Sequence, residues 1–177
     1  MLETLITSKT RINLLLKFFL NSNNKAWLRS LESEFGESTN AIRLELNRLK
    51  KGGLLRTLSQ GNKIVYMANT DHPLYEDIHS LLLKHIGLDK IIDKITTKLG
   101  DIDSVYLVGE LANGKNSIIL DLWFIGEAID KNYLLNLVEK SEKMINRKIR
   151  YMVLSGKERK KFLASKSNDE LLLIWKT

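Results

Sequence analysis

The sequence predicts an α+β protein in which two domains are joined by helices. Three observations support this class. Residues 1–70 show a helix, turn and helix pattern followed by two β-prone runs, residues 71–100 hold a lone proline and amphipathic helices, and residues 101–177 alternate short β-prone runs with a helical pattern. With 177 residues and 44% hydrophobic content, the chain is long enough for two small cores.

Within the first domain, residues 25–69 predict two short helices, a tight turn, a third helix and a hairpin. Gly36 ends one helical pattern, and Ser38 opens the next by accepting hydrogen bonds from free backbone amides. Apolar residues recur at helical spacing before this turn (Trp27, Leu28, Leu31, Phe35) and after it (Ile42, Leu46, Leu49). We expect these apolar stripes to be the buried faces of a helix-turn-helix.

A glycine-tipped hairpin follows that motif. Gly52 and Gly53 stop the helix, and the apolar, β-prone runs 54–58 and 63–68 flank a polar tip at residues 59–62. A hairpin in this position is the wing of a winged helix-turn-helix. This layout makes double-stranded DNA the first partner to consider.

The outward face of the predicted helix 39–51 carries polar side chains that can reach base edges in a major groove. Arg43 and Asn47 are the leading candidates, and the wing cations Arg56 and Lys63 would meet phosphate. The predicted DNA-binding residues are Thr39, Asn40, Arg43, Asn47, Arg48, Arg56 and Lys63. The alternative is that the motif is a protein-binding module on which these side chains are only solvated.

The charge distribution agrees with DNA binding. Residues 9–63 contain eleven Lys or Arg against four Glu, a net charge of +7 that equals the net charge of the whole chain. A local excess of cations suits phosphate binding, because each neutralised phosphate releases counterions and makes binding weaken with salt.

The segment LESEFGESTNAIRLELNRLKKGGLLRTLSQGNKIVYMAN resembles the winged-helix domains of bacterial transcriptional regulators, including the arsenic-repressor-like group. The resemblance covers roughly the first 70 residues. It implies a transcriptional regulator that reads an operator in double-stranded DNA.

Residues 71–100 predict two linker helices. Pro73 suits the first position of a helix that runs to Gly87, and a second amphipathic pattern, residues 88–99, ends at Gly100. Their apolar stripes fit pairing with a second copy in a homodimer, as two DNA half-sites require, or packing within one chain.

The last domain predicts a small α/β unit with strands at 105–109, 118–125 and 148–154, a helix at 133–145, and a loop of helical character at 110–115. In order and spacing it resembles the nucleotidyltransferase fold of the DNA polymerase beta superfamily, especially its minimal prokaryotic members. Their pattern is glycine-serine, about ten residues, then aspartate-x-aspartate.

The chain departs from that pattern where metal would bind. The glycine is kept as Gly109, but Glu110 replaces the serine, Ile119 replaces the first carboxylate, only Asp121 remains, and Arg150 occupies the third-strand position. Because magnesium is held by clustered carboxylates, we expect no catalysis, no metal and no cofactor. Without metal, a nucleotide or another anion has these candidate contacts: Gly109, Asn113, Gly114, Lys115, Asp121 and Arg150.

Composition also bears on metal binding and on where the protein is located. The chain has no cysteine, and His72, His79 and His85 lack companions at metal-ligand spacing. No signal peptide or membrane-spanning run is present, so we expect a cytoplasmic protein without a membrane partner.

Two local patterns concern the end of the chain. Ser155 and Glu158 have the spacing of a helix capping box, and the apolar residues 171–175 are expected to dock on the domain.

We therefore expect a DNA-binding transcriptional regulator whose second domain assembles subunits or senses a ligand. The alternatives are an active nucleotidyltransferase that uses Asp121 and Glu110, and an antitoxin-like protein-interaction module.

Overall fold

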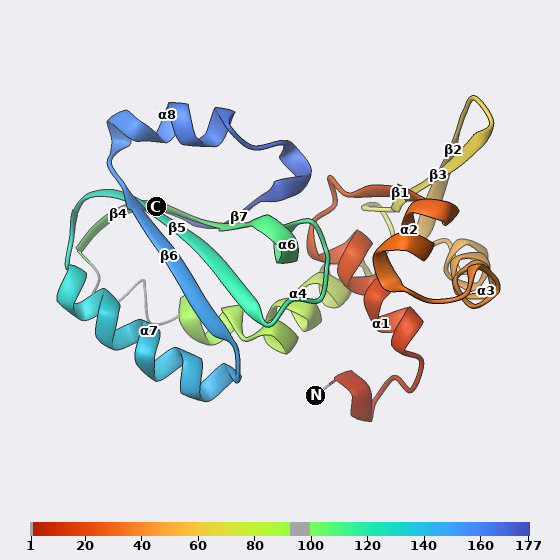
Figure 1. Cartoon of the computed structure of the whole chain (residues 1–177), viewed down its shortest axis with the longest axis horizontal. Coiled ribbons are helices and arrows are strands. Elements are labelled where there is room, and N and C mark those ends of the chain that lie inside the picture. Colours follow the sequence, from red (N-terminus) through yellow and green to blue (C-terminus); the bar gives the residue numbers. More distant parts are fainter. Residues whose placement is uncertain (1, 93–99) are drawn as a thin grey trace. The chain divides into compact units, whose positions relative to one another are not determined.

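The computed structural model describes residues 2–92 and 100–177, which form two compact units, Met1–His85 and Ile86–Thr177 (Figure 1). Each unit has its own sheet, with strand order β1-β3-β2 in the first and β6-β5-β4-β7 in the second. The predicted mixed α+β class is confirmed.

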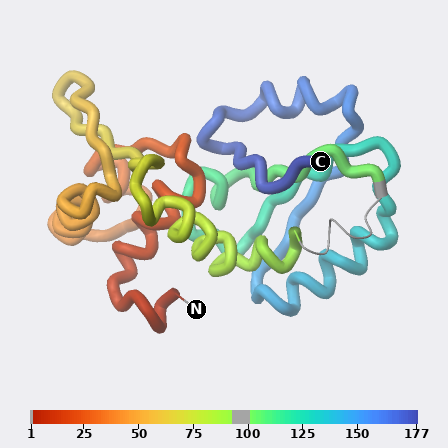
Figure 2. The backbone as a smooth tube through the Cα atoms, turned by 180° about the vertical axis from the view of Figure 1, so that it is seen from behind, coloured from red at the N-terminus to blue at the C-terminus, as the bar shows by residue number. Residues whose placement is uncertain are grey.

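The N-terminal unit is a winged helix-turn-helix. Helices α2 and α3 flank the turn, and the hairpin β2–β3 projects from the unit as the wing (Figure 2). In chain order its elements are η1 (Leu2–Thr4), α1 (Lys9–Leu15), the π-helical η2 (Leu16–Leu20), β1 (Lys25–Trp27), α2 (Leu28–Phe35), α3 (Thr39–Lys51), β2 (Leu55–Gln60), β3 (Lys63–Ala68) and α4 (Tyr75–Ile86).

The turn forms by the local chemistry that the sequence indicates. Gly36 ends α2 with φ of 63°, a left-handed conformation that suits glycine, and Ser38 opens α3 by accepting a hydrogen bond from the amide of Ala41 at 3.2 Å. The predicted helix 39–51 is confirmed with both of its ends.

The structure corrects the segment before the turn. Residues 25–27 form β1, which pairs antiparallel with β3, and only one helix, α2, lies between this strand and the turn. Ala26 is buried between the exposed Lys25 and Trp27, an alternation typical of a strand. The wing turn is also tighter than predicted, because Gln60 pairs with Lys63 around a two-residue tip.

The core of this unit gathers apolar side chains from every helix. Fully buried are Leu14, Leu16, Phe18, Phe19, Leu31, Ile42, Leu46 and Leu82. Helix α4 begins at Tyr75, two residues after the predicted start at Pro73, and the Tyr75 ring lies 5.9 Å from that of Phe19. Packing within the chain therefore accounts for buried positions on this linker helix.

The second linker helix, predicted over residues 88–99, lies largely outside the described residues, since residues 93–99 are not among them. Gly100, expected at the end of that helix, instead opens strand β4. No helix in the described part of the chain combines the length and apolar character needed to cross a bilayer.

The C-terminal unit is a mixed four-stranded sheet with α7 and α8 on opposite sides (Figure 1). Strand β5 is parallel to β6 and antiparallel to β4, which is antiparallel to β7. In chain order its elements are β4 (Gly100–Val108), α6 (Gly109–Ala112), β5 (Ile119–Ile129), α7 (Lys131–Ile145), β6 (Lys148–Leu154), α8 (Gly156–Ala164), η3 (Asn168–Glu170) and β7 (Leu171–Lys176).

Several expectations for this unit are confirmed. Strand 148–154 matches β6, Ser155 and Glu158 form the capping box that opens α8, and the apolar C-terminal run docks as β7 beside β4. Strands β4 and β5 are longer than predicted. The start of β4 reads as a loop in sequence because it holds two aspartates, but its pairing with β5 keeps it extended.

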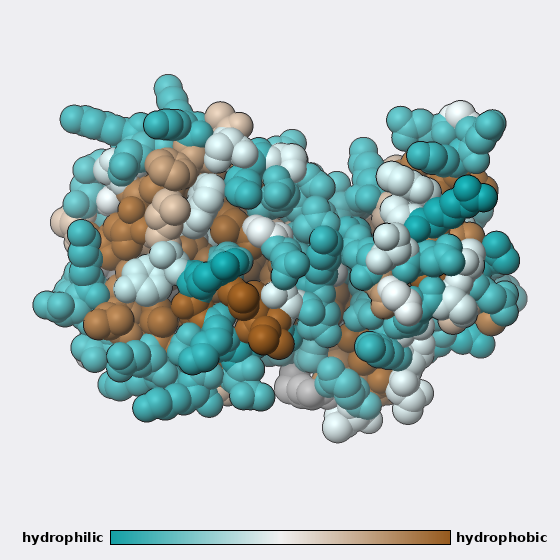
Figure 3. Space-filling model, viewed as in Figure 1, coloured by the Kyte–Doolittle hydropathy of each residue, from teal (hydrophilic) through white to brown (hydrophobic). Residues whose placement is uncertain are grey.

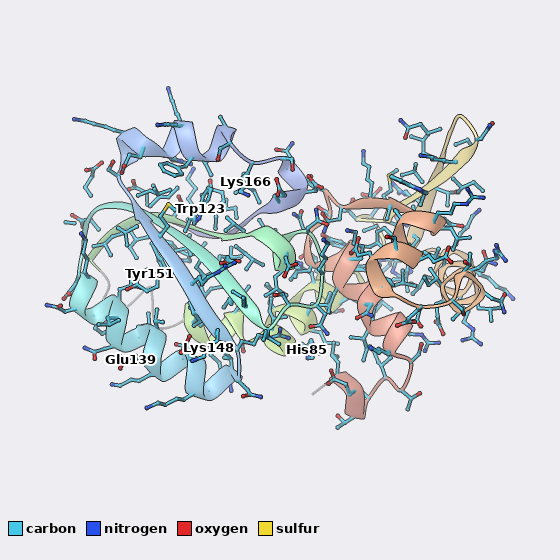
Figure 4. All side chains as sticks on the ribbon, in the orientation of Figure 1. His85, Trp123, Glu139, Lys148, Tyr151 and Lys166 are labelled. Atoms are coloured by element: carbon cyan, nitrogen blue, oxygen red, sulfur yellow. The ribbon has the colours of Figure 1, made fainter. Side chains whose placement is uncertain are left out.

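Side chains of the sheet alternate between the two helices. Trp123 lies on the α8 side, where its ring meets that of Phe162 edge to face at 5.9 Å. Tyr151 lies on the α7 side, where it meets Phe124 at 6.3 Å (Figure 4). The sheet thus has an apolar layer on each face.

A buried carboxylate fixes α3 against α1 in the N-terminal unit. Glu45, only 5% exposed, accepts two hydrogen bonds from Arg11 of α1, at 2.8 and 3.2 Å, and one from Arg48 at 2.8 Å. Ser8 adds a hydrogen bond from its hydroxyl at 3.3 Å. Three side chains therefore donate hydrogen bonds to one buried charge.

Two more polar contacts join the first helices to the motif. Lys17 of η2 forms a largely buried ion pair with Glu34 of α2 at 2.9 Å. Thr10 of α1 donates a hydrogen bond to Glu37 in the turn. The N-terminal helices thus hold α2, the turn and α3 by separate side chains.

We expect Glu45→Gln to lower the free energy of unfolding by about 2 kcal/mol, because it leaves Arg11 and Arg48 without their charged acceptor. Urea unfolding followed by circular dichroism measures the change. Glu32→Gln, which alters an exposed carboxylate on α2, is the matched control and should change stability by less than about 0.5 kcal/mol. Equal effects of the two substitutions would contradict the anchoring role.

The contribution of Glu45 should also depend on pH. Burial raises the pKa of Glu45, but hydrogen bonds and attraction from Arg11 and Arg48 outweigh it, and the net pKa is lowered. The stabilisation is then fully present above the unfolded-state pKa and is lost as pH falls through the lower folded-state pKa. The stability difference between wild type and Glu45→Gln should shrink below about pH 4. A difference unchanged down to pH 2 would refute this.

Candidate functional site

The outer face of α3 presents polar side chains to solvent. Ile42, Leu46 and Leu49 are buried, so Asn40, Arg43 and Asn47 on the other side are exposed, while Thr39 is half-buried in the first turn. Side chains three and four positions apart lie on one helix face. The structure therefore brings Asn40, Arg43 and Asn47 onto one exposed face, as the helical period predicts.

Two of the predicted phosphate or base contacts are paired with carboxylates. Arg48 is held by Glu45 at 2.8 Å, and Arg56 of the wing forms an ion pair with Asp71 at 2.6 Å. Asp71 compensates the charge of Arg56, whereas Arg48 shares the single charge of Glu45 with Arg11 and is only partly compensated. The expectation that they contact DNA is therefore weaker than for Arg43.

Lys63 of the wing has a different partner. Its Nζ lies 4.3 Å from the centroid of the Trp27 ring, a cation–π contact. The indole is uncharged, so Lys63 keeps its full positive charge. Sequence reasoning missed this role of Trp27, which it placed on the buried face of a helix. In the structure, the alternation of exposed Lys25, buried Ala26 and exposed Trp27 marks a strand.

A concave surface lies between the wing, the β1–α2 junction and α3. This wing hollow has a volume of about 620 Å³ and is lined by Trp27, Leu28, Arg29, Arg43, Asn47, Asn62, Lys63, Ile64 and Tyr66. Its lining holds three cations and no carboxylate. An anionic group that also offers an apolar surface, such as a sugar–phosphate, matches this chemistry.

The second candidate site is the place where the nucleotidyltransferase pattern would bind metal. Asp121 of β5 and Arg150 of β6 are direct neighbours in the parallel register. Arg150 donates two hydrogen bonds to the Asp121 carboxylate, from Nε at 2.6 Å and from Nη2 at 2.8 Å. The Asp121 side chain is 17% exposed and that of Arg150 is 67% exposed. Both carboxylate oxygens are therefore engaged by one guanidinium.

Gly109 and Glu110 lie close to this pair. Gly109 opens α6 with φ of 72°, and a Cβ there would stand only 3.2 Å from Oδ2 of Asp121. The hydrogen bonds to Asp121, together with attraction from Asp121 and Glu110, raise the pKa of Arg150. The guanidinium thus stays charged at every working pH.

The other predicted anion contacts have surroundings of their own. Asn113 donates a hydrogen bond to Asp169 of η3 at 2.9 Å, Gly114 is buried, and the side chain of Lys115 is exposed. Of the six candidates, Gly109, Asp121 and Arg150 come together. Here the charge of Arg150 is already compensated by Asp121, and a further carboxylate, Glu110, lies nearby. This arrangement is a poor binding site for an anion.

These residues do not fit a pair of magnesium ions. Among the described residues, no group of three His, Cys, Asp or Glu side chains is placed to hold a metal. Ile119 has no ligand atom, and the Arg150 cation repels a metal at Asp121. No catalytic step through metal follows from this site.

The surface around the Asp121–Arg150 pair is partly apolar. The pair borders a shallow hollow of about 190 Å³, whose lining includes Trp123, Tyr151 and Met152. Tyr151 and Met152 are each 39% exposed. Figure 3 shows apolar side chains gathered over this unit on the visible face. The surface is better suited to packing than to phosphate binding.

No protein-family model and no curated protein matches the sequence. Reduced HlyU from Vibrio cholerae is a similar solved structure, with 19% identity, a TM-score of 0.38, and coverage of 47% of this chain and 82% of that chain. The antimony-specific transcriptional repressor AntR is similar with 21% identity, a TM-score of 0.36, and coverage of 48% and 71%.

A candidate nucleotidyltransferase from Sulfolobus solfataricus is also similar, with 20% identity, a TM-score of 0.36, and coverage of 56% of this chain and 86% of that chain. All three TM-scores are below 0.5, so these likenesses do not indicate a function for this chain.

We expect Arg150→Glu to create a weak Mn²⁺ site, because it replaces the blocking cation by a carboxylate next to Asp121. Electron paramagnetic resonance of Mn²⁺ measures binding, with Arg150→Gln as the control that removes the cation and adds no ligand charge. Wild type should leave Mn²⁺ free at millimolar concentration. Wild-type binding that disappears in Asp121→Asn would contradict the blocked site.

Proposed function

We propose that this chain is a DNA-binding transcriptional regulator that reads an operator through α3 and the wing. The observation that carries the proposal is the exposed set of Asn40, Arg43 and Asn47 beside a hollow rimmed by cations. Thirteen helical residues span about 20 Å, which suits a helix lying in a major groove about 12 Å wide.

The side chains on this face match known base chemistry. The planar guanidinium of Arg43 can donate two hydrogen bonds to a guanine edge, and the amide of Asn47 can pair with an adenine edge. Arg43 has no ion-pair partner among the described residues. Arg29 and Lys63 supply charge for phosphate, while Arg48 and Arg56 contribute less.

We propose domains at residues 1–70 and 101–177 with linker helices at 71–100, and a cytoplasmic homodimer that reads two half-sites. The C-terminal domain serves assembly or sensing, without catalysis. The Asp121–Arg150 pair supports this role, because it closes the acidic position that nucleotidyl transfer needs. A nucleotide or other anion would bind there only by displacing the pair.

A second candidate function is an antitoxin-like protein-interaction module. Leu44 of α3 and Leu58 and Ile64 of the wing are each more than half exposed. Exposed apolar side chains of this size favour a protein partner over DNA. Absence of any DNA binding at low salt would favour this second function over the first.

We expect selection from a random DNA pool to recover a consensus operator, and its symmetry would give the half-site spacing. Arg43→Ala with Asn47→Ala should then weaken binding to that operator about thirtyfold or more, because two base contacts are lost. Asn136→Ala with Lys140→Ala is the matched control. It removes an amide and a cation, four residues apart, from the exposed side of α7. Equal operator affinity of the two double variants would refute the assignment of the α3 face.

A further inference from the structure

Trp27 is fixed at the junction of β1 and α2 from two directions. In the sheet it is the register partner of Val65 in the wing strand β3. At the helix start, its amide donates a hydrogen bond to the Ser30 hydroxyl at 3.1 Å, and that hydroxyl donates to the Trp27 carbonyl oxygen at 2.7 Å. The backbone from which the indole projects is therefore held in place.

The indole holds the wing lysine. Its ring is beneath the Lys63 Nζ at 4.3 Å, yet the residue remains 37% exposed, so the contact stands at the rim of the wing hollow. A lysine loses much side-chain entropy when a ligand immobilises it, and a side chain already held loses less. The ammonium group is thus already positioned before a ligand binds.

An aromatic partner differs from a carboxylate in one respect that matters for anion binding. Arg56, on the neighbouring wing strand, is oriented by Asp71, but the carboxylate cancels its charge. Lys63 is oriented by a ring that carries no net charge. Lys63 is therefore the wing cation that is both held in place and fully available to a phosphate.

We infer that Trp27 is a positioning residue of the DNA interface, a step that rests on the proposed function. Trp27 holds Lys63 at the rim of the wing hollow, where one DNA strand passes between α3 and the wing. Lys63 contacts a phosphate of that strand, and the apolar side chain of Ile64 meets its sugar. The charge of the lining supports this occupant, since Arg29, Arg43 and Lys63 face no carboxylate in the hollow.

A double-mutant cycle on DNA affinity tests the inference. At fixed salt, Trp27→Leu should weaken operator binding about threefold, whereas Trp27→Phe, which keeps a ring face, should recover most of the affinity. In a Lys63→Met background, Trp27→Leu should have no further effect, because the side chain that it positions is gone. An equal loss in both backgrounds would mean a purely structural role and would overturn the inference.

Two further measurements separate the ways in which this inference can fail. In the free protein, Lys63→Met should shift the tryptophan emission, and Lys131→Met on α7 should not; no shift with Lys63→Met would overturn the contact itself, even if Trp27→Leu fails to fold. The Arg43→Ala and Asn47→Ala variant is titrated in parallel. If it weakens binding while Trp27→Leu does not, only the role of Trp27 fails. If the chain binds no DNA at all, the proposed function fails with it.

Discussion

The burial of the Glu45 carboxylate is the constraint on which the N-terminal unit depends. A charge on the buried face of α3 is costly unless donors surround it, and here Arg11, Arg48 and Ser8 do so. Helix α3 cannot roll about its axis without breaking these bonds. The same hydrogen bonds orient α3 so that Arg43 and Asn47 are exposed, and they hold Arg48 against Glu45. They therefore determine which cations of α3 are available to a partner.

Features that arise from local chemistry were predictable from sequence. Gly36 and Ser38 mark the turn, and Ser155 and Glu158 mark the start of α8, because their hydrogen bonds join residues within a few positions of each other. Strand β1 was missed for the opposite reason. Three residues carry little intrinsic preference, and they are extended because β3 offers a backbone edge about forty residues later in the chain.

In the candidate sites too, some features are set by residues close in sequence and others by residues far apart in sequence. Helical periodicity alone places Arg43 and Asn47 outward. It cannot show that Arg56 meets Asp71 or that Lys63 meets Trp27, since those partners come from other elements. The resemblance to nucleotidyltransferases implies that Arg150 stands where a carboxylate could be. Only the register of β5 and β6 shows that the replacement binds the carboxylate that remains.

The two units therefore use cations in opposite ways. In the C-terminal unit, Arg150 forms an ion pair with Asp121, and this compensated pair is bordered by exposed Tyr151 and Met152. In the N-terminal unit, Lys63 is held by an indole that leaves its charge intact. A compensated ion pair costs less to bury against protein than a lone cation does, whereas an uncompensated cationic hollow attracts an anionic partner. This contrast is the physical basis on which we propose DNA as the partner of the first unit and assembly as the role of the second.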